Sequence, residues 1–249
     1  MASRVTDPPL PPRAALRWQV VRRIVAQRRP ASILELGCGL GAVGTRLARM
    51  ATYTAVEPDP RSYQVAHRRI SPLGGRVCNG DHRQAPTPGR YDLVCAFEVL
   101  EHLADDAAAL AEWLPLVRPG GRLLLSVPAD PERFGAWDTL VGHYRRYSAE
   151  GLRQRLTEAG ATEIRIVHYG WPLGYLLDTV RDRWAGGPVG NAVEGGTAEE
   201  RTSTSGRILQ PSGVVAGGVI RMAVSPFAVL QRMRPDRGPG LVAVAARPE

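Results

Sequence analysis

Apolar and polar positions along the chain fall into two alternating patterns. Five short runs are expected to be strands: 32–36, 53–57, 91–97 and 122–128, which are mostly apolar, and 75–80, which is apolar only at its centre. Between them, apolar residues recur every three or four positions, which predicts helices over 41–50, 60–70 and 105–117. Continuous apolar runs are typical of parallel strands covered on both faces. The pattern therefore predicts an α/β fold, with a doubly wound and mostly parallel sheet.

The chain before the first strand divides into two parts. Residues 1–13 are rich in proline and are expected to be a flexible leader. A helix is expected over 14–27, because Leu16, Val20 and Ile24 recur on one helical face.

Three elements follow the fifth strand. A helix over 148–160 is expected to begin at Ser148, a good N-cap residue, and to stop at Gly160. Strands are expected over 162–170 and near the end of the chain. We therefore assign the main domain to 14–170 together with 240–249.

The segment 171–239 is expected to be an insertion before the last strand. It begins with a helical pattern, continues as a flexible Gly/Ser/Thr-rich loop at about 185–206, and ends in an apolar helix broken at Pro226. We expect this insertion to be a lid. The alternative is peripheral contact with a membrane or a lipid-linked substrate, which Gly217, Gly218 and Pro226 disfavour because they weaken a long interfacial helix.

Charge and cysteine content limit the possible partners, cross-links and metal sites of the protein. The net charge is +8, but the 32 basic residues are all arginine and are scattered, so nucleic acid is a secondary candidate partner. Cys38, Cys78 and Cys95 lack the spacing of a disulfide framework or a structural zinc site. The chain has no signal peptide and no apolar stretch long enough to span a bilayer, so we expect a soluble, cytoplasmic protein.

The stretch ILELGCGLGAVG, residues 33–44, carries the first sign of a ligand. Glycines at the end of a strand let the chain turn tightly and let a ligand approach the backbone. The spacing from Gly39 to Gly44 also fits a dinucleotide-binding loop, so this motif alone does not choose between NAD and S-adenosylmethionine (SAM). Glu57, at the end of the second strand, is placed to accept hydrogen bonds from ribose hydroxyls, and Asp81 to accept one from an adenine amino group.

Taken together, the motifs resemble those of a known family. The set E-L-G-C-G-x-G, V-E-P-D, G-D, Y-D-L-V-x-x-x-E-V-L-E-H and R-P-G-G is similar to that of class I SAM-dependent methyltransferases. It is nearest the subgroup that contains the ubiquinone-pathway O-methyltransferases, and it covers about residues 30–170 and the final strand. The resemblance implies a seven-stranded sheet whose last strand is antiparallel. An NAD enzyme would need a residue that assists hydride transfer to the substrate, and we recognise no such residue in the sequence.

The resemblance also implies roles for individual residues. The methionine end of SAM would lie against Glu35, Gly37, Cys38, Gly39 and Gly41. The remaining contacts would come from Glu57 and Pro58 at the ribose, Asp81 and His82 at the adenine, and Phe97 and Glu98 over the methyl donor.

A second group of residues is expected on the acceptor side. Glu98, Glu101 and His102 would share one face of a helical turn, and His143 resembles the distal histidine of metal-dependent small-RNA 2′-O-methyltransferases. These four residues suit a divalent cation such as Mg²⁺. In the alternative, Glu98 faces the cofactor and His102 acts as a base, so His102 and His143 are the catalytic candidates. The candidates for substrate binding are Tyr144, Arg145, Trp137 and Trp171.

From these features we expect transfer of a methyl group from SAM to a small-molecule acceptor, at a hydroxyl group. One alternative is metal-dependent RNA 2′-O-methylation, which the basic charge favours. Another is a SAM-binding regulatory or partner protein without turnover. The sequence names neither the acceptor nor the oligomeric state.

Overall fold

The computed structural model describes residues 7–86, 90–187 and 214–249. In this part of the chain one sheet has the strand order β3-β2-β1-β4-β5-β7-β6. Its strands are β1 (Ser32–Leu36), β2 (Thr52–Glu57), β3 (Arg76–Asn79), β4 (Tyr91–Phe97), β5 (Val117–Pro128), β6 (Thr162–Tyr169) and β7 (Gly240–Ala246). β7 runs antiparallel to both of its neighbours, while the other pairings are parallel. The predicted seven-stranded fold is confirmed.

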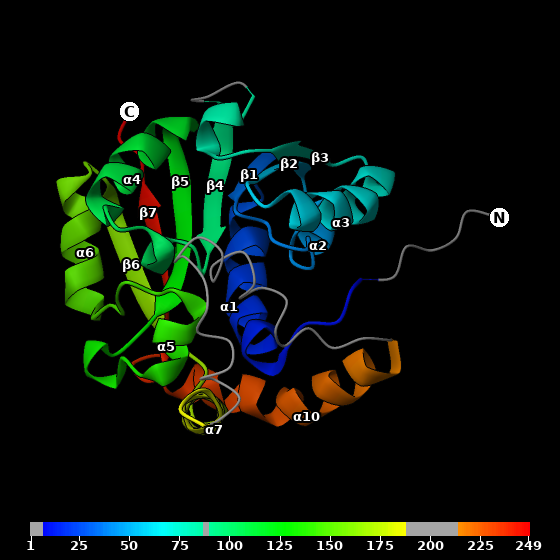
Figure 1. The fold of residues 1–249 in the computed structure, drawn as a ribbon. Helices are drawn as coiled ribbons and strands as arrows, with labels where there is room; N and C mark the ends of the chain where they lie inside the picture. The colour runs from blue at the N-terminus through cyan, green and yellow to red at the C-terminus, as the bar shows by residue number, and fades with distance from the viewer. Residues whose placement is uncertain (1–6, 87–89, 188–213) are drawn as a thin grey trace.

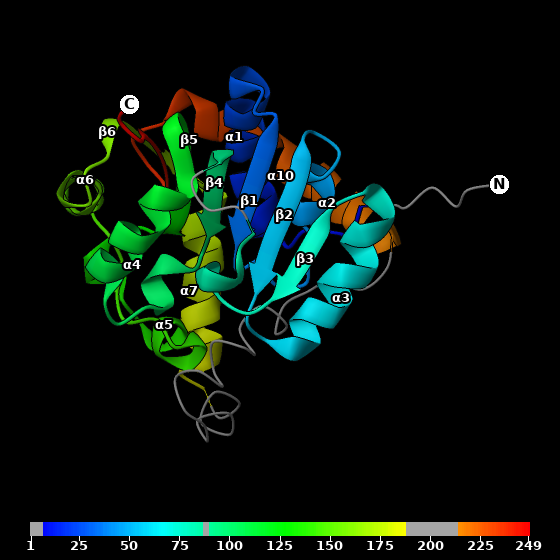
Figure 2. The ribbon, with the colours of Figure 1, turned by 90° about the horizontal axis from the view of Figure 1, so that it is seen from above.

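Helices cover both faces of the sheet (Figures 1 and 2). One face is covered by α1 (Pro12–Arg28), α2 (Gly44–Leu47), α3 (Pro60–Ile70) and α10 (Val214–Met233). The other is covered by α4 (Asp106–Trp113) and α6 (Ala149–Glu158). Two more helices, α5 (Ala136–Val141) and α7 (Leu173–Ala185), pack against each other. Short 3₁₀ helices are η1 (Ser71–Leu73), η2 (His82–Gln84), η3 (Leu100–His102), η4 (Leu114–Leu116) and η5 (Pro131–Arg133).

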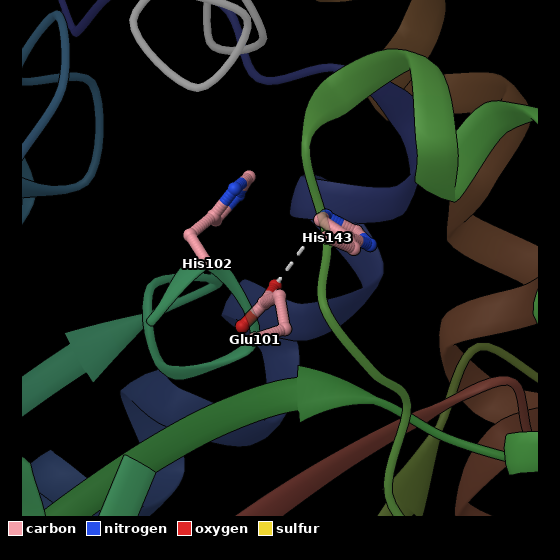
Figure 3. Close-up of side chains that lie close together, drawn as sticks. All are labelled: Glu101, His102 and His143. Carbon is pink, nitrogen blue, oxygen red and sulfur yellow. Dashed lines mark ion pairs between the residues drawn. The ribbon is translucent and has the colours of Figure 1, made fainter. Parts of the chain in front are cut away.

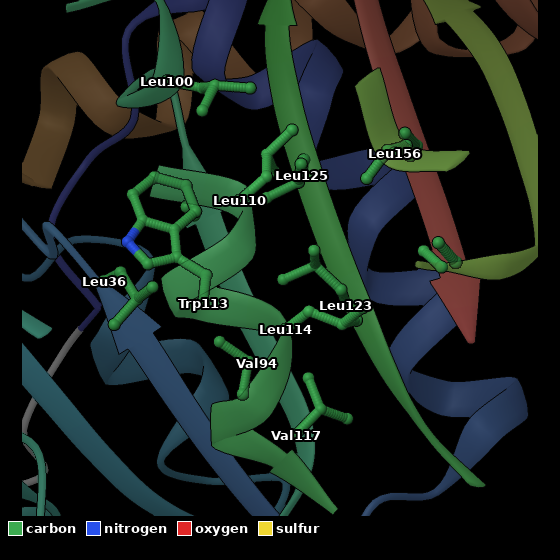
Figure 4. Close-up of a cluster of buried hydrophobic side chains, with 14 of the residues drawn as sticks. Leu36, Val94, Leu100, Leu110, Trp113, Leu114, Val117, Leu123, Leu125 and Leu156 are labelled. Carbon is green, nitrogen blue, oxygen red and sulfur yellow. The ribbon is translucent and has the colours of Figure 1, made fainter. Parts of the chain in front are cut away.

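The sheet separates two apolar clusters, because successive side chains of a strand point to opposite faces. Leu123 and Leu125 of β5 pack with Leu110 and Trp113 of α4 (Figure 4). Leu124 belongs to the opposite cluster, whose α1 members are Leu16, Val21 and Val25. Each such side chain contributes about 1.5–3 kcal/mol when fully buried. The predicted buried face of α1 is correct at Leu16. Further along the helix the buried residues are Val21 and Val25, whereas the predicted Val20 and Ile24 are only half-buried.

Three predicted boundaries were wrong. The helix expected over 41–50 is only the single turn α2, because Gly41 has a φ of 76° and interrupts the helical path. The R-P-G-G segment is part of β5, which begins at Val117, and Gly120 takes a φ of 68° within it. Finally, α10 continues through Pro226. Buried Val224 and Ala228 hold it against the core on both sides of that proline, so packing outweighs the lost hydrogen bond.

The leader and the insertion are described in part. Leu10 is buried, and the Pro8 carbonyl accepts a hydrogen bond from Arg46, so the leader is packed against α2 from about this point. Most of the loop expected at about 185–206 lies outside the described residues. α7 and α10 belong to the insertion, whose role as a lid stays a prediction. Within the described ranges, we find no helix with the length and apolar character that crossing a membrane requires.

Candidate active site

The glycine loop lies between β1 and α2 and leaves space at one position. Gly37, Gly39 and Gly41 have φ values of 70°, 55° and 76°, which favour glycine. A Cβ atom on Gly37 would lie 2.8 Å from Val99 Cγ2, and one on Gly41 would lie 3.1 Å from the Cα of Ala66. At Gly39 the same atom would meet nothing within 4 Å. The backbone of Gly39 is therefore open to a ligand, while the other two glycines permit close packing.

Glu57 joins the end of β2 to this loop. Its carboxylate accepts hydrogen bonds from the backbone N–H groups of Gly39, at 2.7 Å, and Asp59, at 3.0 Å. Burial raises the pKa of Glu57, although these two hydrogen bonds oppose the shift. A carboxylate oxygen has more than one lone pair, so Glu57 can also accept from ribose hydroxyls. Glu57 is thus placed where a nucleoside beside Gly39 would meet it.

The other nucleoside candidates lie nearby in the fold but are more exposed. The side chain of Asp81 is 46% exposed and accepts a hydrogen bond from the Arg83 backbone N–H at 2.8 Å. The His82 ring lies 2.5 Å from a carboxylate oxygen of Glu112. Pro58 is exposed. Contact of these residues with adenine or ribose stays a prediction.

Glu35 and Cys38 are directed into the protein interior. Glu35 is 2% exposed and accepts a hydrogen bond of 2.5 Å from the Tyr53 hydroxyl. Burial raises the pKa of Glu35 to about 7, although the Tyr53 hydrogen bond opposes the shift. Burial also raises the pKa of the Cys38 thiol, so it stays a neutral packing group. Their expected contact with the methionine end of a ligand stays a prediction.

The buried Glu35 carboxyl group makes the stability of the fold depend on pH. Its pKa rises from an ordinary 4.5 to about 7 on folding, so the folded chain holds a proton that the unfolded chain releases. This contribution is fully present below pH 4.5 and is lost as pH rises through 7. Denaturant unfolding should therefore show that the free energy of unfolding of wild type falls by about 1–3 kcal/mol, relative to that of Glu35→Gln, between pH 4.5 and pH 7.

The Glu35→Gln variant keeps the acceptor for Tyr53 but cannot ionise at this position, and so is the matched reference. Parallel stability profiles of the two proteins over this pH range would contradict the assignment.

Glu98 differs from its expected role as a metal ligand. It takes a left-handed conformation, with a φ of 57°, between β4 and η3. Its carboxylate is directed to Ser126 at 2.9 Å, Tyr169 at 3.2 Å and Arg17 at 3.2 Å, and it is not part of the ligand group formed by Glu101, His102 and His143. Burial alone would raise the pKa of Glu98, but the charges of Arg17 and Arg13 lower it to about 2. The Arg17 guanidinium also lies 5.7 Å from the ring centroid of Phe97.

The remaining three acceptor-side candidates do meet (Figure 3). Glu101 and His102 come from η3, and His143 follows α5. One ligand atom from each lies within 4.8 Å of the others. The His143 Nε2 atom is 3.9 Å from Glu101 Oε1, and the two imidazole rings meet edge to face at 4.6 Å between centroids. The turn after β4 therefore brings together three of the four predicted ligands.

Burial decides the charge of this cluster, which we call the Glu101 cluster (Glu101, His102 and His143). Glu101 is fully buried, and neither carboxylate oxygen has a hydrogen-bond partner among the described residues. Burial and the nearby charge of Glu98 raise the pKa of Glu101 well above its ordinary value. Burial, with the neighbouring His143, lowers the pKa of His102 to about 3, so this imidazole is neutral near pH 7. Such a cluster contains a neutral nitrogen base beside an unsatisfied carboxyl group.

Sequence reasoning missed the group that holds His143. Asp138 Oδ1 lies 2.6 Å from His143 Nδ1, and Asp138 Oδ2 is paired with Arg146 at 2.8 Å. Arg146 also pairs with Asp178 of α7, which in turn pairs with Arg13 of α1. Although burial opposes it, the hydrogen bond from His143 and the charge of Arg146 lower the pKa of Asp138. Asp138 belongs to no recognised motif, and its only sequence signal was its position in the short helix five residues before His143.

The substrate candidates are spread over the region around α5. Tyr144 is 50% exposed, whereas the Arg145 guanidinium is engaged by Asp106 at 3.0 Å. Trp137 is buried and packs at 6.1 Å from Trp184, so it supports the contact between α5 and α7. Trp171, just before α7, is half-buried. Binding of an acceptor by these residues stays a prediction.

Comparison with known protein families matches residues 13–165 to a family described as a methyltransferase domain. The chain is similar to a mitochondrial ubiquinone biosynthesis O-methyltransferase of Schizosaccharomyces pombe, with 37% identity over 38% of this chain and 36% of the relative. A ubiquinone biosynthesis O-methyltransferase of Xanthomonas axonopodis pv. citri is 32% identical over 48% of this chain and 53% of the relative. The chain thus matches about half or less of the length of these relatives.

Solved structures share the fold at low sequence identity. The YcgJ protein of Bacillus subtilis has a TM-score of 0.61 at 15% identity, over 94% of this chain and 99% of its own. The N-methyltransferase NodS of Bradyrhizobium japonicum, in complex with S-adenosyl-L-homocysteine, has a TM-score of 0.55 at 21% identity, over 93% and 85%. The [4+2]-cyclase SpnF has a TM-score of 0.58 at 20% identity, over 92% and 81%. The fold alone therefore does not choose the reaction.

Proposed function

Because the chain belongs to the methyltransferase-domain family, we propose that it transfers the methyl group of SAM to a hydroxyl group of a small-molecule acceptor. We place the SAM site at the glycine loop after β1, where the backbone of Gly39 is open to a ligand. The observation that carries the choice of a hydroxyl is the Glu101 cluster, which follows β4, the strand next to β1. The two loops touch, as the closeness of Gly37 to Val99 demonstrates. The names of the similar O-methyltransferases support the same choice.

The proposed reaction is a direct displacement at the methyl carbon. The acceptor oxygen forms a bond to this carbon as its bond to sulfur breaks, and S-adenosylhomocysteine leaves with the electron pair. The hydroxyl proton passes to a neutral imidazole. His143 suits this step, because the Asp138 carboxylate on its other nitrogen stabilises the imidazolium that forms. The burial that keeps His102 neutral makes it the weaker proton acceptor. The sulfonium already activates the methyl group, so orientation accounts for much of the expected rate.

The Glu101 cluster also fits a divalent cation of the kind bound by one carboxylate and two imidazoles. The two buried oxygens of Glu101, which have no hydrogen-bond partner among the residues that the structure describes, are the observation that favours this second possibility. Glu101, His102 and His143 would hold the ion. When bound, a cation lowers the pKa of a hydroxyl group beside it. The same cluster would then serve the same overall reaction.

A turnover experiment tests the proposal. The protein is incubated with methyl-labelled SAM and matched acceptors that differ only in a phenolic hydroxyl, an amine or a thiol, with RNA as a separate acceptor. Each reaction is run with EDTA and with added Mg²⁺, Mn²⁺ or Zn²⁺. We expect label on the hydroxyl acceptor. Label on RNA alone would support the RNA alternative, and SAM binding without labelling of any acceptor would support a non-catalytic binding protein.

A further inference from the structure

The segment between β5 and α6 contains a buried carboxylate, Asp138, that was not among the predicted site residues but contacts one of them, His143. Asp138 lies in α5, is fully buried, and uses its two oxygens differently. Oδ2 accepts hydrogen bonds from Arg146 Nε at 2.8 Å and from the Gly135 backbone N–H at 3.0 Å, and it is paired with Arg146 Nη2 at 2.8 Å. Oδ1 faces only His143 Nδ1 among these groups, at 2.6 Å. The three donors on Oδ2 therefore fix the orientation of the whole carboxylate.

This orientation determines which nitrogen of His143 carries the proton. An ionised carboxylate only accepts hydrogen bonds, so the hydrogen bond from His143 requires a proton on Nδ1. In a neutral imidazole the other nitrogen, Nε2, then presents its lone pair. Nε2 is the atom that faces Glu101, at 3.9 Å. The lone pair is thus directed into the Glu101 cluster.

From this geometry we infer that Asp138 is a positioning residue, which locks His143 in the tautomer whose Nε2 lone pair faces the acceptor side. The inference rests on the proposed function, because the lone pair serves either to accept the hydroxyl proton or to bind a cation. Asp138 acts through His143 and contacts no reacting atom. Its Oδ2 atom is held by the Gly135 backbone and by Arg146, which also pairs with Asp178 of α7 at 3.2 Å. Helix α7 of the insertion is thereby connected to the acceptor side.

The substitution Asp138→Asn changes this one property with little change in volume. In this variant only the side-chain oxygen can accept from Arg146 and Gly135, so the amide NH₂ group must take the place of Oδ1. That group donates to His143 Nδ1, which must then be the acceptor and lose its proton. The proton moves to Nε2, and the lone pair facing Glu101 is lost. The expected consequence is a loss of turnover by about 100- to 10,000-fold, comparable with the effect of a wrong histidine tautomer in serine proteases.

The matched control is Asp178→Asn. Asp178 is also buried and also paired with Arg146, but it does not touch His143. If Asp138 only stabilised the fold, both variants would lower the melting temperature and leave the histidine tautomer alone. We expect the loss of turnover and the tautomer change in Asp138→Asn only, with the Kd for SAM within about threefold of wild type in both variants, a change of less than about 1 kcal/mol.

The tautomer is read directly from long-range ¹H–¹⁵N spectra of full-length protein labelled at histidine, with His143→Gln used to assign the signals. We expect wild type and Asp178→Asn to carry the proton on Nδ1, and Asp138→Asn to carry it on Nε2. A wild-type proton on Nε2, or normal turnover in Asp138→Asn, would overturn the inference. The wild-type spectrum decides even when a variant does not fold. Absence of methyl transfer to hydroxyl acceptors would instead overturn the proposed function, and the tautomer measurement would still stand.

Discussion

Replacing Glu57 with alanine is expected to weaken SAM binding by about 100-fold or more. The Glu57 carboxylate is placed at the end of β2 beside the open backbone of Gly39, where it would accept from the ribose hydroxyls. Hydrogen bonds to a charged group contribute about 1.5–3 kcal/mol each, and 1.4 kcal/mol is about tenfold in affinity. The affinity of Glu57→Gln for SAM should lie between those of wild type and Glu57→Ala, because glutamine keeps one accepting oxygen and replaces the other with an NH₂ group. Isothermal titration with SAM measures both variants.

Asp92→Ala is the control for this prediction. Asp92 is likewise a strand carboxylate that accepts backbone hydrogen bonds, from Ala31 and Ser32, and it pairs with Arg118 at 2.6 Å. It lies near the beginning of β4, whereas Glu57 ends the parallel strand β2, so the two carboxylates lie at opposite ends of the strands. Its loss should lower stability and leave the Kd for SAM unchanged. Wild-type affinity in Glu57→Ala would contradict the placement of the nucleoside.

Replacing Glu101 with methionine is expected to stop turnover and at the same time to stabilise the fold. Within the described part of the chain the Glu101 carboxyl group has no hydrogen-bond partner, and burying such a group costs about 1–3 kcal/mol, whereas methionine fills a similar volume without a polar group. The melting temperature should therefore rise by about 2–4 °C per kcal/mol gained. Turnover should fall about 100-fold or more, since the cluster loses its carboxyl group. Such opposite effects are typical of residues kept for function at the expense of stability.

Glu35→Met provides the contrast. Glu35 is equally buried, but it is hydrogen-bonded to Tyr53, so its removal leaves the tyrosine hydroxyl unpartnered and should destabilise the protein. Differential scanning calorimetry measures the melting temperature of each variant, and methyl transfer from labelled SAM measures its turnover. A lower melting temperature in Glu101→Met, or turnover near that of wild type, would contradict the account of this cluster.

Local sequence patterns were sufficient for most of the fold. β1, β4 and α3 were predicted at their observed bounds, because each is a short apolar or amphipathic run bordered by glycine, proline or a charged residue. Ser148 was predicted as the N-cap of α6, and its hydroxyl oxygen accepts from the Gly151 backbone N–H. Such features depend on neighbours within a few residues. The seven-stranded sheet with an antiparallel last strand followed from the family resemblance, which carries information that periodicity lacks.

The errors have a common physical origin. The continuity of α10 through Pro226 depends on packing against a helix about two hundred residues earlier in the chain. The pairing of Glu98 with Arg17 and Ser126, in place of a position among the ligand group, accompanies a left-handed backbone at Glu98 that the sequence spacing does not reveal. Asp138 was missed because its role arises from contacts with His143 and Arg146 in the folded chain. Packing, backbone conformation and charge pairing in the folded chain therefore determine the features that the sequence motifs do not.

The central claim is that the loop after β1 and Glu57 hold the adenosine of SAM with its sulfur toward the Glu101 cluster. A crystal structure of the complex with S-adenosylhomocysteine tests this claim most directly. The account predicts ribose hydroxyls within about 3 Å of the Glu57 carboxylate, the ligand against Gly39, and the sulfur on the side of His143. A ligand bound elsewhere, or a sulfur directed away from His143, would contradict it.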